Sequence, residues 1–312
     1  MISPKKALDD IKNARNIAIF CHINPDADAL ASCAAIKKLI KLNLINSEET
    51  KVIDIFFEFE EISELNSAII KGVETNIKNC EKYDIAICVD CSSLDRLGKY
   101  KDLFLSIENT INFDHHATNE EFAYNNLVLK KASSTCEVLY TLAKTQNFHI
   151  SDEVCKLIYA GIITDTCNLT QGTITVRTHK IITEFIERGI DVDSLNDHFF
   201  KNNTKSKAYL LKEALDSLTF YANDRIAFMK LTKQDLQECD ATFDDTLGIV
   251  NQGIEIKGVD IAILAIKQED NSYYVSLRGK NEVDVSLIAK SMGGGGHEQV
   301  AAFQYSGFLA DL

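Results

Sequence analysis

The sequence predicts an α/β protein with an N-terminal doubly wound, mainly parallel sheet and a smaller C-terminal α/β domain. Three observations lead to this fold class. Apolar runs typical of buried strands alternate with amphipathic helical stretches between about residues 14 and 189. Shorter strand-like runs return from about residue 220, after a polar stretch. A chain of 312 residues is also long enough for two domains, each with its own core.

The first domain contains four clear strand candidates and several helical patterns. The strand candidates are RNIAIFC, KVIDIFF, YDIAICVD and NTINFD. Between the first two of them, ALASCAAIKKLIKLN has apolar residues at helical spacing. Farther along, YAGIIT is interpreted as another apolar strand, and KIITEFIERGI as a helix.

A polar stretch separates the two predicted domains. We expect a first domain over residues 1–190, a helical linker over 191–219 and a second domain over 220–312. The strand candidates of the second domain are RIAFMKLT, VDIAILAIKQ and SYYVSLRGK, followed by a short helix and the run GGGGH.

Composition restricts the partners and the compartment. A formal net charge of -13 disfavours binding to duplex nucleic acid, which requires basic surface. An anionic substrate must therefore meet a local positive site, such as metal ions. Nine cysteines without a framework spacing suggest free thiols in a reducing compartment. The charged N-terminus is unlike a signal peptide and no apolar run could span a bilayer, so we predict a cytoplasmic protein without membrane association.

The segment FCHINPDADALAS places three ionisable side chains directly after the first strand. They are His22, Asp26 and Asp28, and a helix-favouring run begins at Ala29. Crowded carboxylates repel one another and lose stability unless a cation lies between them. This turn therefore predicts a cation site.

Further acids and histidines follow other apolar runs. Asp90 ends IAICVD, the residues Asp114, His115 and His116 end INFDHH, and Asp165 follows YAGIIT. A single aspartate after a strand is more often a turn former or a helix cap. Four strand ends together favour convergence, because ligands bind at the carboxyl ends of the strands in an open α/β sheet.

The mixture of side chains indicates a chemistry. Carboxylate and imidazole ligands suit Mn²⁺ or a similar first-row ion, whereas thiolates select softer metals. A carboxylate such as Asp90 can bridge two ions, and water held between two cations is activated for attack near neutral pH. The predicted cofactors are two Mn²⁺ ions, with other divalent metals open, and the natural substrate is a phosphorus ester.

At this point the sequence resembles the DHH phosphoesterase superfamily. HINPDADALAS, VD at 89–90, DHH at 114–116 and GIITDT at 161–166 are similar to its four signature motifs, and GGGGH at 293–297 is similar to its C-terminal motif. The resemblance implies one metal held by His22, Asp26 and Asp90. It implies a second held by Asp28, Asp90, His115 and Asp165. It also implies catalytic roles for Asp90 as the bridging ligand, His116 facing the substrate phosphate, and Asp114 fixing the histidines.

The C-terminal glycine run predicts a substrate contact. Consecutive glycines let backbone approach a ligand, and at the start of a helix their N–H groups would favour an anion. Arg278 can fork onto a phosphate, and His297 can hydrogen-bond a phosphate or sugar oxygen. The expected substrate-binding residues are Arg278, Gly294, Gly295, Gly296 and His297. This region resembles the DHH-associated domain of the two-domain nano-RNase and pAp-phosphatase group, except that Ala302 stands where that group has glycine.

The resemblance implies a Mn²⁺-dependent phosphoesterase that releases 5′-mononucleotides from short oligoribonucleotides and also dephosphorylates 3′-phosphoadenosine 5′-phosphate (pAp). Two alternatives stay open. One is a phosphodiesterase dedicated to linear dinucleotides such as pApA, and the other is a non-catalytic nucleotide sensor. The oligomeric state, a homodimer included, the preferred base and the direction of degradation also stay open.

Overall fold

The computed structural model describes residues 4–45, 50–58, 69, 82–268, 272–280 and 282–307. It divides into two compact units, Met1–Lys201 and Asn202–Leu312, and each is described by itself. Of the predicted linker, residues 191–219, one helix belongs to each unit: α8 (Val192–Phe200) to the first and α9 (Lys205–Asp216) to the second. Within the described ranges, no helix has the length and apolar character needed to cross a membrane.

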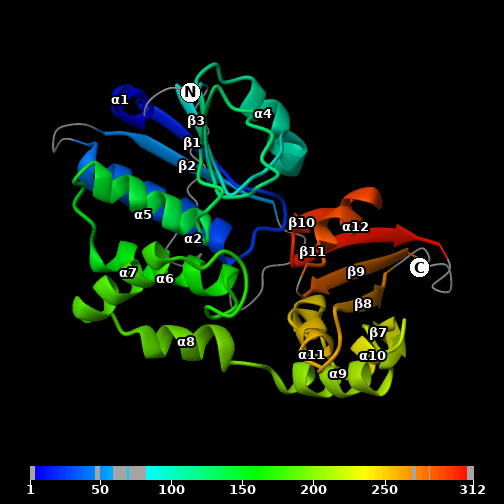
Figure 1. Ribbon diagram of the computed structural model, residues 1–312. Coiled ribbons are helices and arrows are strands. Elements are labelled where there is room, and N and C mark those ends of the chain that lie inside the picture. The colour runs from blue at the N-terminus through cyan, green and yellow to red at the C-terminus, as the bar shows by residue number, and fades with distance from the viewer. Residues whose placement is uncertain are drawn as a thin grey trace. The chain divides into compact units, whose positions relative to one another are not determined.

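The first unit is built on a parallel sheet of five strands (Figure 1). The strands are β1 (Asn16–Phe20), β2 (Val52–Phe56), β3 (Ile85–Val89), β4 (Thr110–Asp114) and β5 (Asn125–Val128). Their order is β2-β1-β3-β4-β5, and the register places Ile17 between Ile53 and Ile85. The order reverses between β1 and β3, which is where ligands bind in doubly wound sheets. The four predicted strands and the fold class are confirmed.

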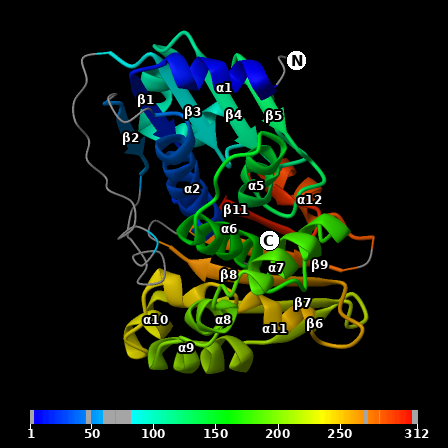
Figure 2. The same ribbon diagram turned by 90° about the vertical axis from the view of Figure 1, so that its left-hand side faces the viewer.

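Helices cover both faces of this sheet. They are α1 (Pro4–Asn13), α2 (Ala27–Asn43), the 3₁₀ helix η1 (Leu94–Tyr100), α4 (Lys101–Leu105), α5 (Thr135–Thr145), α6 (Asp152–Asp165), α7 (Val176–Glu187) and α8. Ile17 and Ile19 share a buried cluster with residues of α2, α5 and α6. Ala18 and Phe20 point the other way, into a cluster with residues of η1 and α4. Figures 1 and 2 show α2, α5 and α6 gathered on one face.

One predicted strand is a helix. YAGIIT lies inside α6, which begins after Ser151, whose hydroxyl accepts a hydrogen bond from the Val154 amide. The buried residues Val154, Ile158 and Ile162 recur every four positions and form one face of this helix. The β-branched run was therefore a poor guide, because helical spacing over a longer window outweighs local strand preference. Asp165 is the last residue of α6 and does not follow a strand.

The second unit is a six-stranded mixed sheet with its own core. Its strands are β6 (Thr219–Tyr221), β7 (Ile226–Leu231), β8 (Ile261–Lys267), β9 (Ser272–Gly279), β10 (Gly295–His297) and β11 (Val300–Ser306). Its helices are α9, α10 (Lys233–Glu238), η2 (Phe243–Thr246), α11 (Val250–Ile254) and α12 (Val285–Ser291). The order is β10-β11-β9-β8-β7-β6, in which only the β7–β8 pairing is parallel among the described strands. The three predicted strands are confirmed as β7, β8 and β9.

The glycine run follows a helix instead of starting one. Gly293, at φ +80°, ends α12, and the Gly294 amide donates back to the Ala289 carbonyl. The chain then enters β10, where Gly295 pairs with Ala302 of β11 in regular antiparallel register. The prediction of an anion site at a helix N-terminus is therefore wrong, because a left-handed glycine terminates a helix at this position. Alanine at 302 is accommodated in this pairing.

Candidate metal centre

The candidate site lies at the carboxyl ends of β1, β3 and β4. His22 follows β1, Asp90 follows β3, and the segment 114–116 ends and follows β4. Asp28 reaches the same place from the first turn of α2, and Asp165 from the end of α6. The structure therefore brings together every predicted ligand of the first unit, including Asp165, whose element was predicted wrongly.

Asp26 has two functions at the start of α2. Its Oδ1 accepts a hydrogen bond from the Ala29 amide, so it is the N-cap that starts the helix. Its Oδ2 lies 3.9 Å from His22 Nε2, which is also 3.6 Å from Asp90 Oδ2. Ligand atoms of His22, Asp26 and Asp90 all lie within 4.8 Å of one another. This is the set predicted for the first metal.

Asp90 stands at the middle of the cluster. Its carboxylate also lies 3.5 Å from His115 Nε2 and 3.7 Å from His116 Nδ1. Its backbone is left-handed, at φ +56°, and its amide donates to the carbonyl of Phe113. Aspartate tolerates this conformation better than most residues do. The sharp turn after β3 directs a buried carboxylate toward the centre.

A second group of ligands surrounds His115. Its Nε2 is 3.4 Å from Asp165 Oδ2, and its Nδ1 lies 3.4 Å from the carbonyl oxygen of Ala132. Ligand atoms of Asp28, His115 and Asp165 lie within 4.8 Å of one another. With Asp90 beside His115, these are the four residues predicted for the second metal.

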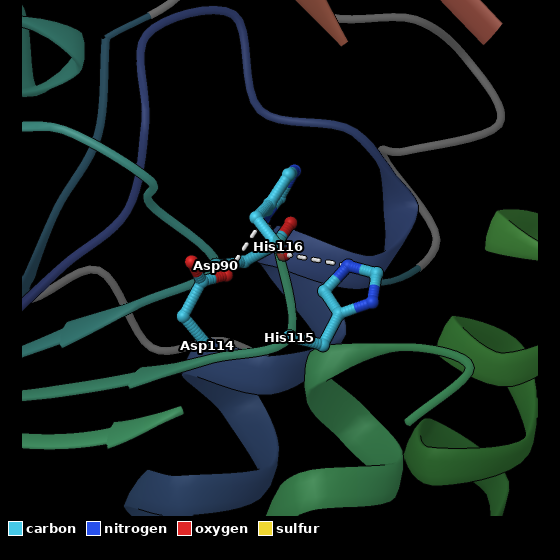
Figure 3. A group of neighbouring side chains, drawn as sticks. All are labelled: Asp90, Asp114, His115 and His116. Carbon is cyan, nitrogen blue, oxygen red and sulfur yellow. Dashed lines mark hydrogen bonds and ion pairs between the residues drawn. The ribbon is translucent and has the colours of Figure 1, made fainter. Parts of the chain in front are cut away.

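Asp114 is held between two neighbours. Its Oδ1 accepts a 2.7 Å hydrogen bond from His116 Nδ1, which is drawn in Figure 3. Its Oδ2 accepts one from the Asn119 side chain. Asp114 is fully buried, whereas His116 keeps 21% of its side-chain surface. This pairing fixes the orientation of the His116 ring, which supports the predicted positioning role of Asp114.

Two carboxyl groups of the centre resist ionisation. Burial raises the pKa of Asp28 well above its usual range, and the charges of Asp90, Asp165 and Asp26 add to this. Burial and the charges of Asp26 and Asp90 likewise raise the pKa of Asp165 well above its usual range. Both groups would be ionised by a cation placed among them, because an opposite charge favours the carboxylate.

The histidines favour the ionised form of Asp90. Burial opposes its ionisation, but the hydrogen bond from His22 and the charges of His116 and His115 hold the pKa of Asp90 below its usual range. Burial lowers the pKa of His115, and the charge of His116 lowers it further. A neutral imidazole beside an ionised carboxylate is the protonation state that metal binding requires.

The donor set fits divalent cations. Carboxylate oxygens and imidazole nitrogens from five aspartates and three histidines converge, all from the first unit. No cysteine of the described residues joins these groups, which disfavours the softer metals. The centre is thus a site that can bind metal, as the sequence predicted.

Several supporting residues escaped prediction from the sequence. Thr135 and Cys136, at the start of α5, donate their backbone amides to the Asp28 carboxylate at 2.7 and 3.1 Å. The Thr135 hydroxyl also donates to Asp90 Oδ1 at 2.9 Å. The available signal was the spacing of Ser134 and Glu137, which indicates a helix start, and Ser134 indeed caps α5.

The start of α5 is itself anchored by a buried acid. Glu137 is fully buried and accepts hydrogen bonds from the Ser133 and Thr178 hydroxyls and from Arg177 Nε. Gly161 of α6 completes the packing, since a Cβ there would lie 2.3 Å from Asp28 Oδ1 and 2.4 Å from Cys136 Sγ. Asp28 can occupy its place only because residue 161 is glycine.

The predicted substrate residues of the second unit lie on neighbouring strands. Arg278 of β9 pairs with Val300 of β11, which pairs with His297 of β10, so their backbones form one row across the sheet. Arg278 Nε donates to Asn251 Oδ1 at 2.9 Å. The side chain of His297 lies outside the described part of the structure.

The glycines of this run have different structural demands. A Cβ at Gly294 or Gly296 would lie 2.2–2.3 Å from carbonyl oxygens of β11, so close strand packing alone explains glycine at both positions. Gly295 has open space around its Cα, with nothing within 4 Å of a Cβ built there. Among the predicted glycine contacts, only residue 295 lacks a packing reason to be glycine.

Comparison with known proteins identifies the two units. Residues 16–162 match the DHH family N-terminal domain, and residues 225–310 match the DHHA1 domain. A relative from Streptococcus mutans, named a probable bifunctional oligoribonuclease and PAP phosphatase, is 27% identical, covering 95% of this chain and 92% of its own length. A relative from Thermus thermophilus with the name bifunctional oligoribonuclease and PAP phosphatase is 24% identical, over 95% of this chain and 86% of its own.

A solved structure has the same fold. An exopolyphosphatase-related protein from Bacteroides fragilis superposes with a TM-score of 0.85 at 23% identity, covering 98% of this chain and 93% of its own. The fold and the carboxylate–histidine centre are those of an α/β protein of two compact units with a site that can bind metal. The chain therefore contains a DHH family N-terminal domain followed by a DHHA1 domain, and it is a phosphoesterase.

Proposed function

We propose that this phosphoesterase uses two Mn²⁺ ions to release 5′-mononucleotides from short oligoribonucleotides and to dephosphorylate pAp. The observation that carries the proposal is the convergence of two ligand groups on Asp90 at the carboxyl edge of the sheet. The names of the relatives from Streptococcus mutans and Thermus thermophilus support the substrate class. The cytoplasm remains the predicted compartment.

The first unit supplies the metal ligands. His22, Asp26 and Asp90 would hold one cation, and Asp28, Asp90, His115 and Asp165 the other. When bound, such cations neutralise charge on phosphoryl oxygens and activate water for attack on phosphorus. The surrounding protein orients the carboxylates beforehand, because α5 holds Asp28 through two backbone amides and Asp90 through the Thr135 hydroxyl.

His116 is proposed to act on the leaving oxygen. Burial lowers its pKa, but the hydrogen bond and charge of Asp114, with the charge of Asp90, raise the pKa of His116 to about 9. The ring therefore carries its proton near neutral pH, and Asp114 holds the Nδ1–H. This makes Nε2 the atom that stabilises negative charge or gives a proton to the departing oxygen.

The second unit is proposed to hold the nucleotide portion of the substrate. Arg278 offers a guanidinium that can fork onto a phosphate or stack on a base. Gly295 has open space at its Cα, so close packing between strands does not explain why residue 295 is glycine. Gly294, Gly296 and His297 complete the proposed contact surface, as the family resemblance implies.

The first experiment is a time course on the purified full chain with Mn²⁺. The substrates are 5′-labelled di-, tri- and pentaribonucleotides and pAp, and the products are resolved by length. Hydrolysis of the short chains together with pAp supports the proposal. Cleavage confined to dinucleotides would replace it with a dedicated dinucleotide phosphodiesterase, and tight nucleotide binding without hydrolysis would replace it with a sensor.

The matched variant for this assay is Asp90→Asn, because asparagine tolerates the left-handed backbone at residue 90. Loss of the central carboxylate should reduce Mn²⁺-dependent turnover by about a hundredfold or more. The control is Asp102→Asn, which removes an exposed carboxylate from α4 and should leave turnover unchanged. Near-normal turnover by a folded Asp90→Asn variant would contradict the two-cation mechanism.

A further inference from the structure

An arginine outside all the predicted site residues lies beside the metal centre. Arg96 belongs to η1, and its carbonyl accepts a hydrogen bond from the Ile23 amide at 2.8 Å. One residue farther along the same turn, the Asn24 amide donates to the carbonyl of Glu58, whose carboxylate accepts from the Lys99 amide. These bonds fasten the η1 segment to the turn that follows His22.

Gly98 allows this segment to come so close. Its backbone, at φ +56° and ψ -133°, is one that residues with a side chain rarely adopt. A Cβ at this position would lie 2.3 Å from Ile23 Cγ2 and 2.8 Å from Glu58 Oε2. The backbone of Arg96 is therefore held at the rim of the centre, whereas its side chain is exposed.

The guanidinium of Arg96 contacts His22 on the side away from the acids. Arg96 Nη2 lies 3.0 Å from His22 Nδ1, and the same Nδ1 lies 2.8 Å from the carbonyl oxygen of Ile23. His22 Nε2 points the other way, toward Asp26 and Asp90. Nδ1 can accept from Arg96 or donate to Ile23, but one ring nitrogen cannot do both.

A bound cation would favour the second of these arrangements. If His22 held a metal through Nε2, the ring proton would be on Nδ1, where it can be donated to the Ile23 carbonyl. Arg96 would then have no acceptor on the His22 ring. Arginine stays charged under these conditions, so its exposed guanidinium is available to an anionic partner in place of water.

The position of Arg96 points to the nature of that partner. The charge of Arg96 opposes protonation of both His22 and His116, although their carboxylate partners raise the pKa of each overall, so the guanidinium lies near the metal ligands and near the residue proposed to act on the leaving oxygen. The chain as a whole is strongly acidic, at a net charge of -13. An exposed, fixed positive charge at this rim is suited to a phosphate.

We propose that Arg96 binds a phosphoryl oxygen of the substrate once cations fill the centre, as a phosphate ligand contributed by the DHH domain itself. The inference rests on the proposed function for the identity of the substrate. The guanidinium exchanges its contact with His22 for a charge-assisted hydrogen bond to the phosphate.

The test uses the full chain and three variants. Arg96→Gln removes the charge, Arg96→Lys keeps the charge without the fork, and Lys101→Gln removes an exposed charge paired with Asp95 on the neighbouring helix. Two affinities are measured by calorimetry: that of the metal-free protein for Mn²⁺, and that of the Mn²⁺-loaded protein for inorganic phosphate. The KM and kcat for pAp are measured alongside.

We expect Arg96→Gln to bind phosphate about tenfold or more weakly, since a charge-assisted hydrogen bond is lost. The Mn²⁺ affinity of Arg96→Gln should remain near that of the natural chain, and its KM for pAp should rise. Arg96→Lys should recover part of the phosphate affinity. Lys101→Gln should match the natural chain in all of these quantities. Unchanged phosphate affinity in Arg96→Gln overturns the proposal. A tenfold loss of Mn²⁺ affinity in that variant also overturns it, because Arg96 would then act by supporting His22.

Failure of the proposed function gives a different pattern. If the natural chain hydrolyses neither pAp nor short oligoribonucleotides, the substrate assignment falls. The calorimetric comparison of phosphate binding still decides the role of Arg96, because it requires no turnover.

Discussion

At the scale of single residues, the metal centre depends on close packing as much as on its ligands. Asp28 is almost completely buried, and its carboxylate is enclosed by the amides of Thr135 and Cys136 and by the Cα of Gly161. Burial of a charged group is unfavourable unless it is hydrogen-bonded or paired. The two amide donors compensate part of this cost, and a bound cation would compensate more.

Gly161→Ala tests this packing. The added Cβ would overlap Asp28 Oδ1 and Cys136 Sγ, so Asp28 must move away from its partners. We expect a loss of stability of about 1–3 kcal/mol and a fall in Mn²⁺ affinity of about tenfold or more. Urea unfolding and calorimetric Mn²⁺ titration measure the two effects. Lys156→Ala, an exposed change on the same helix, should alter neither, and full Mn²⁺ affinity in Gly161→Ala would contradict this packing.

The Asp114–His116 pair predicts a pH dependence for the metal-free protein. The pKa of His116 is raised to about 9 from an ordinary value of 6.5. A raised pKa in the folded state contributes stability that is fully present below pH 6.5 and is lost as the pH rises through about 9. The expected contribution is about 1–3 kcal/mol.

Asp114→Asn should remove most of this contribution. It replaces the charged acceptor of His116 Nδ1 with a neutral one, so the pKa of His116 should fall. NMR titration of the His116 ring measures the midpoint, and urea unfolding at pH 6 and pH 9 measures the stability. An unchanged midpoint in Asp114→Asn would show that Asp114 is not the main cause of the shift. Asp102→Asn on α4 is the matched control.

At the scale of elements, the N-terminus of α5 joins the two ligand groups. The Thr135 amide binds Asp28 and the Thr135 hydroxyl binds Asp90, although these acids are 107 and 45 residues away in the chain. Glu137, in the first turn of the helix, ties α5 to Arg177 and Thr178 of α7. The position of one short helix start therefore determines the geometry of both candidate metal positions.

Thr135→Val tests the contribution of the hydroxyl. Valine keeps the shape of threonine but cannot donate to Asp90, so the carboxylate is held less firmly. We expect Mn²⁺ affinity to fall about tenfold, as is typical when a partner of a metal ligand is removed. Calorimetry gives the affinity. Thr145→Val is the control, because the Thr145 hydroxyl donates only to the Leu142 carbonyl of its own helix, and equal affinities in the two variants would refute the role of Thr135.

The elements also show how far the sequence could predict the site. His22, Asp26, Asp90 and the segment 114–116 follow parallel strands, whose carboxyl ends share one edge of the sheet. Strand-end reasoning therefore found them. Asp165 was found for a wrong structural reason, since it ends a helix that packs against α2 and α5.

The site residues that the sequence did not predict depend on contacts between segments far apart in the chain. Thr135 and Gly161 gain their roles from contacts with Asp28, which no local pattern encodes. Arg96 lies in the short 3₁₀ helix η1, and its relation to His22 follows from the left-handed Gly98. In the second unit β10 and β11 escaped prediction, and for β10 the reason is that the short run GGH carries no apolar periodicity.

At the scale of the whole molecule, each unit has a core of its own. The core of the first unit joins the sheet to α2, α5 and α6, and the second unit has buried clusters around Met229 and Leu264, and around Val275 and Phe303. All predicted metal ligands belong to the first unit. Independent cores favour independent folding of the two units.

We therefore expect the separate fragments 1–201 and 202–312 to fold. Each should show a cooperative thermal transition by circular dichroism, and fragment 1–201 should bind Mn²⁺ within about threefold of the affinity of the full chain. Calorimetry on the fragment and the full chain makes the comparison. A fragment 1–201 that folds but does not bind Mn²⁺ would show that the centre requires residues of the second unit.

The left-handed backbone at Asp90 has an evolutionary consequence. Residue 90 must supply a carboxylate for chemistry and accept a positive φ for folding, and few side chains meet both demands. In a descendant that is no longer selected for activity, only the need for a positive φ at residue 90 remains. It would drift first to asparagine or glycine at this position, whereas β-branched residues would be removed by their effect on folding. Among homologous sequences, the identity of this residue should thus distinguish proteins that have lost hydrolytic activity but kept the fold from proteins that are losing the fold as well.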